Sequence, residues 1–267
     1  DWLVVGGSAS DGARFLGSRE LANGKVLEQS VVATLVATDL DVHHAMEHGF
    51  VPADRAFPIT EAEGYLVKKI DGKLAVDFYA DLLGVKRKQL TKGLGLIRMT
   101  DKVPKFLTAM TQKVGLTPQV ITDKIPFFTY SNQQPFGVKS ESGTYVVKVP
   151  KVITTEGWLE FQTRMDDVAE LQLMRVDDER SLSASARAIS TVDGAAAAGG
   201  HAPRLVLVYE CLGRYMYLLK QIDRLFPKVR DATGAEIVGF FSAAEQGVME
   251  GLGCQAHNYT TSVIGLG

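Results

Sequence analysis

The clearest pattern of hydrophobic and polar positions lies in the C-terminal third of the chain. Residues 203–211, PRLVLVYEC, form an apolar run of the length expected for a buried strand. Similar runs at 236–242 and 259–266 predict two more buried strands. Helical spacing at about 215–226 predicts a helix that Pro227 ends. Alternation of strand, helix and strand favours parallel pairing in this region.

The middle of the chain has shorter and more regular alternation. Between residues 126 and 176, short apolar runs are separated by glycine turns, which is typical of antiparallel strands. An acidic turn is predicted at 177–179. Residues 180–189 then have helical spacing and are expected to run into the alanine-rich stretch at 195–200.

The first half of the chain combines strand signals with turn signals. Residues 25–40 are rich in β-branched side chains, which predicts strand. Pro52 and Pro58 predict a loop, and the Asp71-Gly72 pair predicts a hairpin turn. Residues 74–83 have the apolar spacing of a helix.

One further helix is predicted at residues 103–114. Together the elements predict an α/β or α+β fold, with mixed sheets flanked by helices, in two subdomains. The apolar run at Trp2–Val5 enters a glycine turn at once, which suggests that the chain starts inside a larger fold.

Composition narrows the classes of function. The chain has 267 residues, of which 29 are basic and 31 acidic, so its formal charge is −2. No basic stripe marks a nucleic-acid surface, so no nucleic-acid partner is expected. No apolar run reaches the length of a membrane span, and the start of the chain lacks the pattern of a signal peptide. We therefore expect no membrane partner and a cytoplasmic location.

A glycine-rich segment follows the first apolar run. The segment is GGSASDG at residues 6–12, and successive backbone N–H groups in such a turn can bind an anion. Its spacing matches neither GxGxxG nor GxxxxGK[ST]. The segment is therefore either a structural turn or a loop that lines a ligand site, in which Gly6, Gly7, Ser8 and Asp11 are the candidate residues.

Four later residues are candidates for the same ligand site. Glu245, at the end of a strand in GFFSAAEQG, either receives an amine or hydroxyl group or caps the following turn. Arg214 follows a buried strand in ECLGR and either binds a carboxylate or makes an internal salt bridge. His257 and Asn258 precede the last strand. A guanidinium and a carboxylate together would suit an amino acid.

Histidines supply a second kind of candidate. If the extended state continues through residues 42–48, His44, Met46 and His48 share one face of a strand. Such a face offers His44 and His48 as haem or metal ligands, and His257 is a further candidate for the proximal position. The alternative is that the clustered histidines are ordinary surface residues.

The two cysteines raise the question of catalysis. Cys211 and Cys254 are too few for a disulfide scaffold and are expected to be reduced thiols. Either thiol would need His257 and an orienting acid nearby to act as a nucleophile. Nothing in the spacing demands this arrangement, so we expect a protein that is not an enzyme, with a cysteine hydrolase as the alternative.

Several of these segments resemble one family in order along the chain. GGSASDG, LVYECLGR, GFFSAAEQG and HNYTTSV are similar to motifs of FIST domains, as are EHGFVPADRAFPIT and IDGKLAVDFYADLLG. The resemblance implies the remainder of an N-terminal FIST domain at residues 1–80 and a C-terminal FIST domain at 81–267. Ala244 departs from the family, which prefers glycine there. The resemblance also implies that the chain lacks roughly the first third of an N-terminal FIST domain.

The resemblance implies a sensory domain that binds a small molecule, such as an amino acid, and reports to a signalling partner. One branch of the family consists of standalone haem proteins that respond to nitric oxide and regulate a histidine kinase. This chain carries no kinase, cyclase or receiver segment, so its output is expected to lie in another protein. Haem binding and amino-acid binding both remain open at this point.

Overall fold

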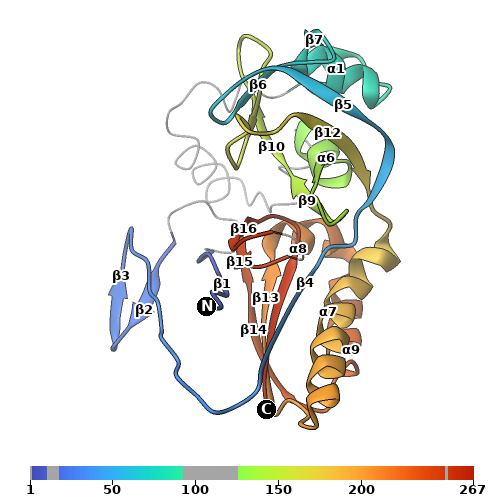
Figure 1. Cartoon of the computed structure of the whole chain (residues 1–267). Coiled ribbons are helices and arrows are strands. Elements are labelled where there is room, and N and C mark those ends of the chain that lie inside the picture. The colour runs from blue at the N-terminus through green and yellow to red at the C-terminus, as the bar shows by residue number, and fades with distance from the viewer. Residues whose placement is uncertain (1, 11–17, 93–125, 250–251) are drawn as a thin grey trace. The chain divides into compact units, whose positions relative to one another are not determined.

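The computed structural model describes residues 2–10, 18–92, 126–249 and 252–267. The chain divides into two compact units, one formed by residues 1–49 and 177–267 and the other by residues 50–176. Helices accompany several sheets with mixed and antiparallel pairing, which confirms the predicted fold class (Figure 1). The helix predicted at 103–114 lies outside the described residues.

The discontinuous unit is built on a four-stranded sheet. Its strand order is β14-β13-β17-β4, with β13 and β14 parallel and the other two pairs antiparallel. The parallel pair confirms the expectation for this region, and the predicted strands lie close to their observed bounds. These bounds are β4 Val42–Glu47, β13 Leu205–Cys211, β14 Glu236–Ser242 and β17 Thr261–Leu266. The prediction that 236–242 is buried is wrong, because β14 is at the edge of the sheet and Val238 and Phe240 are exposed.

Helix α7 (Asp178–Gly199) packs against this sheet, alongside β17 and β4 (Figure 1). Its buried face has the spacing that the sequence indicated: Ile189 and Val192 cluster with residues of the sheet, and Leu182 packs with Leu218 and Leu225 of the helical segment after β13. The acidic turn predicted before it is the start of the helix itself: the Asp177 side chain accepts the Arg180 N–H at 2.7 Å. Gly200, with φ of +90°, ends the helix.

The segment after β13 differs from the single helix predicted there. It consists of α8 (Leu212–Leu218), the 3₁₀ helix η1 (Leu219–Arg224) and α9 (Leu225–Arg230). The prediction that Pro227 ends a helix is wrong, because Pro227 lies in the first turn of α9. The first turn needs no N–H donor from its residues, so proline is tolerated there.

Two small β structures complete this unit. Strands β1 (Gly6–Gly7), β15 (Glu245–Gly247) and β16 (Gln255–His257) form a three-stranded antiparallel sheet. Strands β2 (Glu20–Ala22) and β3 (Lys25–Leu27) form a hairpin. The strand predicted at 25–40 therefore ends early, and Val31 is 94% exposed. Its β-branched residues pair with no strand in the part of the chain that the structure describes, and strand propensity alone does not form a strand.

The second unit is an antiparallel sheet with the strand order β10-β11-β6-β5-β12-β8-β9, and β7 pairs with the edge of β6. The bounds of the strands are β5 Val51–Glu63, β6 Leu66–Ile70, β7 Lys73–Leu74, β8 Phe136–Lys139, β9 Tyr145–Lys148, β10 Pro150–Ile153, β11 Leu159–Phe161 and β12 Glu170–Arg175. Among the described residues of this unit, the helices are α1 Ala75–Leu82, α2 Arg87–Leu90 and α6 Pro126–Gln133.

The turn at Asp71-Gly72 is confirmed, since both residues have the positive φ that a tight hairpin requires. The loop predicted at Pro52 and Pro58 is wrong, because both prolines lie within β5. The pairing of β5 with β12 shifts register between residues 172 and 174, and its pairing with β6 shifts after Ile59. Such irregularities give residues that lack an N–H a place in a strand.

Candidate functional site

Three sequence segments meet in the interior of the discontinuous unit, at the C-terminal end of β13. Cys211 pairs with Ser242 in the parallel register of β13 and β14. The Cys211 N–H donates to Thr260 O at 3.1 Å, and the Tyr259 N–H donates to Cys211 Sγ at 3.2 Å. The motifs LVYECLGR, GFFSAAEQG and HNYTTSV, which are far apart in sequence, therefore share one buried cluster.

The close packing of these three segments requires glycine at position 213. A Cβ at Gly213 would lie 2.8 Å from the ring of Tyr259, so a larger residue would displace that ring. Tyr259 itself has a φ of +57°, a left-handed conformation that is uncommon for an aromatic residue. The surrounding cluster maintains this backbone, as expected at a site whose geometry is constrained.

Glu245 lies at the centre of the cluster. Its side chain has no exposed surface, and its two oxygens contact hydroxyl groups, with Oε1 2.6 Å from Ser242 Oγ and Oε2 2.8 Å from Thr260 Oγ1. Burial raises the pKa of Glu245 to about 8, although the hydrogen bonds with Ser242 and Thr260 oppose this shift. The carboxyl group is therefore mostly protonated at neutral pH.

One proton on Glu245 satisfies the local hydrogen bonds. With that proton on Oε1, the carboxyl donates to Ser242 Oγ, and the Ser242 hydroxyl donates onward to Glu210 O at 3.4 Å. Oε2 then accepts from the Thr260 hydroxyl and, at 3.4 Å, from the Thr260 N–H. These hydrogen bonds stabilise Glu245 as a neutral acid. They would also stabilise the ionised carboxylate if a cation bound beside it.

The glycine segment lies beside Glu245 in the small sheet. Gly7 lies opposite Glu245 in the small sheet, and Glu245 lies opposite His257, so the three residues are neighbours across β1, β15 and β16. The Ser8 N–H donates to Ala244 O at 2.8 Å, and the Ala243 N–H donates to Ser8 O at 2.9 Å. The segment is thus joined by its backbone to the turn before Glu245.

Residue size explains why this segment contains glycine. A Cβ at Gly7 would lie 2.8 Å from Ser242 Cβ, so only glycine allows the backbone to approach so closely. Ala244, where the family prefers glycine, does not have a positive φ and adopts its conformation without strain. Gly6 pairs with Gln246, and Asp11, which the sequence also assigned to this loop, lies outside the described residues.

Arg214 is turned inward rather than toward a ligand. The residue is 1% exposed, and its guanidinium forms an ion pair with Glu210 and donates to Ser181 O and, at 3.2 Å, to Ser185 Oγ. Its Nε has no hydrogen-bond partner among the described residues. Of the two interpretations that the sequence left open for Arg214, this geometry matches the internal salt bridge.

Sequence reasoning missed three members of the cluster, namely Glu210, Ser242 and Thr260. Each is a polar residue in or beside an apolar strand, which is the signal that could have found them. Burial raises the pKa of Glu210, while Arg214 and then Ser185 oppose that shift. His257 and Asn258, which the sequence did assign to the site, are buried beside the same cluster.

The cluster costs stability that an apolar interior would not. Two carboxyl groups and a guanidinium are withdrawn from water, and such groups are often replaceable by apolar residues without loss of stability. Ionisable groups with strongly shifted pKa values gather at functional sites more often than elsewhere. The cluster around Glu245 is therefore the best candidate for a functional site among the described residues.

The histidine candidates are placed differently. His44 is in β4, and its Nε2 lies 3.0 Å from Ser262 Oγ, which in turn donates to Gln246 O at 3.3 Å. Burial lowers the pKa of His44 to about 4, so its ring is neutral. His48 lies beyond the end of β4, so the extended strand does not continue through both histidines.

His44 does not fit a haem as it stands, while His48 and His257 as haem ligands stay predictions. A Cβ at Gly247 would lie 2.8 Å from His44 Nε2, so the backbone of β15 fills the space that a porphyrin would need beside that nitrogen. In the part of the chain that the structure describes, no group of three or more His, Cys, Asp or Glu side chains is arranged to hold a metal ion.

The cysteines are both free thiols. Cys211 is buried, and burial together with the nearby Glu245 carboxyl raises the pKa of its thiol well above the usual range. The reactive form of cysteine is the thiolate, so this environment disfavours a nucleophilic role for Cys211. Cys254 is exposed, with Sγ 3.5 Å from Val4 O. Whether the chain catalyses any reaction stays a prediction.

The fold and the cluster together define an α+β protein of two units, one of which encloses a buried ionisable site. Residues 1–73 match the FIST N domain and residues 116–248 match the FIST C domain. The chain belongs to the FIST family, whose domains are generally sensory domains that bind small ligands. The boundary predicted between residues 80 and 81 stays a prediction.

A curated relative is an uncharacterized protein of Methanocaldococcus jannaschii, which is 24% identical over 211 residues. These residues cover 79% of this chain and 35% of the relative, so the chain spans about a third of that protein's length. No solved structure matches the chain. Among the described helices, none is long and apolar enough to cross a membrane.

Proposed function

We propose that this chain is a sensory domain that binds a small amine-bearing metabolite, such as an amino acid, at Glu245 beneath the glycine segment. The observation that carries the proposal is the register of the small sheet, which places Gly7 and His257 on either side of Glu245, whose carboxyl group is buried. The proposal further holds that the chain is not an enzyme and that a separate signalling protein carries its output.

The chemistry of Glu245 favours an ammonium group as the ligand's anchor. An ammonium donates hydrogen bonds and supplies the positive charge that a buried carboxylate lacks. Because the pKa of Glu245 is about 8, binding an ammonium at neutral pH would ionise the acid and release its proton. Ser242 and Thr260 already offer hydrogen bonds that stabilise the ionised form.

Ligand entry requires the glycine segment to separate from the turn before Glu245. That movement breaks the two backbone hydrogen bonds of Ser8 and moves Gly7 away from Ser242. The position of the glycine segment then depends on whether the ligand is bound, and these two positions are the two states of the sensor. Arg214 keeps its structural role in this scheme, and we do not propose the haem function, because His44 lacks a free Nε2.

The test is a thermal-shift screen of amine-bearing metabolites, including amino acids, against the wild-type chain and two variants. A ligand at Glu245 stabilises the wild-type chain and loses its effect in Glu245→Gln, because the neutral amide cannot neutralise an ammonium. Glu236→Gln, at the exposed start of β14, is the matched control and keeps the response. A response that survives in Glu245→Gln, or no response to any amine, contradicts the proposal.

A further inference from the structure

The side chain of Gln246 takes no part in the hydrogen bonds of Glu245, although the two residues are adjacent in β15. Successive side chains of a strand point to opposite faces, so Gln246 points away from the buried acid. Gly6 lies opposite Gln246 in β1, and a Cβ on Gly6 would lie 3.6 Å from Gln246 Oε1. The Gln246 side chain therefore extends along the glycine segment, on the face opposite to Glu245.

The amide group of Gln246 joins the glycine segment to the turn before Glu245. Its Nε2 donates to Ser8 Oγ at 2.9 Å and to Ala244 O at 3.4 Å. The same Ala244 O accepts the Ser8 N–H at 2.8 Å. A side-chain amide has two N–H donors, so one side chain supplies both contacts and closes a ring with the backbone hydrogen bond of Ser8. We call this group of Gln246, Ser8 and Ala244 the clasp.

The two sides of the clasp are held differently. Strand β15 is attached to the four-stranded sheet, because Ser262 Oγ of β17 donates to Gln246 O at 3.3 Å. A Cβ on Gly247 would lie 2.8 Å from His44 Nε2 of β4, so the backbone of β15 is also closely packed there. Within the described chain, hydrogen bonds from side chains to residues 6–8 come from Gln246 alone. Opening the clasp therefore moves the glycine segment and leaves β15 in place.

We propose that Gln246 is a positioning residue that holds the glycine segment closed and thereby regulates access to Glu245. Loss of the clasp favours the open position of the segment, which is the position that admits a ligand. The closing role of Gln246 needs no ligand, whereas its effect on binding rests on the proposed function. A binding-competent state that is rarely populated weakens the apparent affinity in proportion, so the clasp sets the ligand concentration to which the site responds.

Hydrogen exchange of the chain without ligand, resolved by residue with NMR, tests the clasp. Gln246→Leu removes both donors and should speed exchange of the Ser8 and Ala243 amides by about 2- to 10-fold, the range expected for loss of one hydrogen bond. The Cys211 amide, which donates to Thr260 O in the interior, should exchange as in the wild type. Ser8→Ala removes the acceptor and should act like Gln246→Leu, with no further increase in the double variant.

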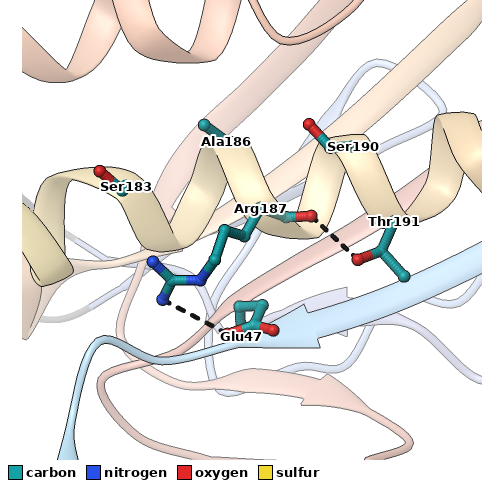
Figure 2. Close-up of a pocket in the computed structure, with 6 residues that line it drawn as sticks. All are labelled: Glu47, Ser183, Ala186, Arg187, Ser190 and Thr191. Atoms are coloured by element: carbon teal, nitrogen blue, oxygen red, sulfur yellow. Dashed lines mark hydrogen bonds and ion pairs between the residues drawn. The ribbon is translucent and has the colours of Figure 1, made fainter.

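Calorimetric titration with methylamine, which supplies the ammonium group alone, measures the effect on binding. The Kd of Gln246→Leu should fall below that of the wild type by the same factor as the exchange of the Ser8 amide rises, because both report the population of the open segment. Gln255→Leu makes the same replacement in β16 and should leave the exchange and the Kd unchanged. Glu47→Gln controls for binding at a surface pocket between β4 and α7, where Figure 2 shows Arg187 directed toward Glu47, and should also leave the Kd unchanged.

The two measurements separate this inference from the proposed function. Unchanged exchange of the Ser8 amide in both Gln246→Leu and Ser8→Ala overturns the clasp, whatever the chain binds. Faster exchange with an unchanged Kd overturns the regulation of access. Methylamine binding that is absent in the wild type, or that survives in Glu245→Gln, contradicts the proposed function, while faster exchange at Ser8 still supports the closing role of Gln246.

Discussion

Replacement of Glu245 by Gln removes one buried titratable group and keeps the size of the side chain. The pKa of Glu245 rises from 4.5 to about 8 on folding, mainly because burial disfavours the charged form. Between these two values the folded chain holds a proton that the unfolded chain has released. The free energy of unfolding of the wild-type chain therefore falls as pH rises through this window.

The size of the effect follows from the shift itself. Each pKa unit corresponds to about 1.4 kcal/mol, so Glu245 lowers the stability of the wild-type chain by about 5 kcal/mol between pH 4.5 and pH 8. Glu245→Gln lacks this contribution. The variant should therefore gain stability relative to the wild type, by about 1.4 kcal/mol for each unit of pH within that window.

Urea denaturation followed by circular dichroism, at several pH values within that window, measures this difference. Among the described residues, the other carboxyl groups with raised pKa values are Glu47 and Glu210, which titrate in both proteins, so their effects largely cancel in the comparison. Glu236→Gln, which changes an exposed carboxylate, should follow the wild type. Parallel curves for Glu245→Gln and the wild type would refute the claim that Glu245 is buried as a neutral acid.

Three further predictions concern Arg214, Gly7 and the two cysteines. Arg214→Met leaves Glu210 buried and unpaired, so it should lower the free energy of unfolding by about 3–5 kcal/mol, and a loss near zero in urea denaturation would contradict the buried pair. Gly7→Ala places a methyl group 2.8 Å from a neighbouring Cβ and should cost about 1–3 kcal/mol and speed hydrogen exchange at residues 6–8; unchanged exchange would show that this contact is absent. A thiol reagent should modify exposed Cys254 quickly and buried Cys211 only in denaturant, whereas rapid labelling of both would exclude the buried thiol.

The sequence predicted those elements whose own pattern decides their structure. The strands at 205–211 and 236–242 have continuous apolar runs, and the hairpin at Asp71-Gly72 has residues that accept positive φ. Residues 28–40 did not form the predicted strand, because strand propensity needs a partner strand, which the sequence does not reveal. The prediction that Pro227 ends a helix failed because a proline can also lie in the first turn of a helix.

The sequence predicted several residues of the candidate site, but not the contacts that these residues make. The glycine segment, Glu245 and His257 were assigned together, and the structure aligns them across one sheet. The role of Arg214 could not be resolved, because its partner Glu210 lies inside a strand that the sequence marks as apolar.

The central claim is that Glu245 receives the ammonium group of a small ligand and gives up its proton in doing so. Calorimetric titration at pH 7, repeated in buffers with different ionisation enthalpies, counts the protons released on binding of an amine identified by the thermal-shift screen. With a pKa of about 8 for Glu245, the account predicts release of about 0.9 proton for each bound ligand. Binding with no proton release, or equal release in Glu245→Gln, would contradict it.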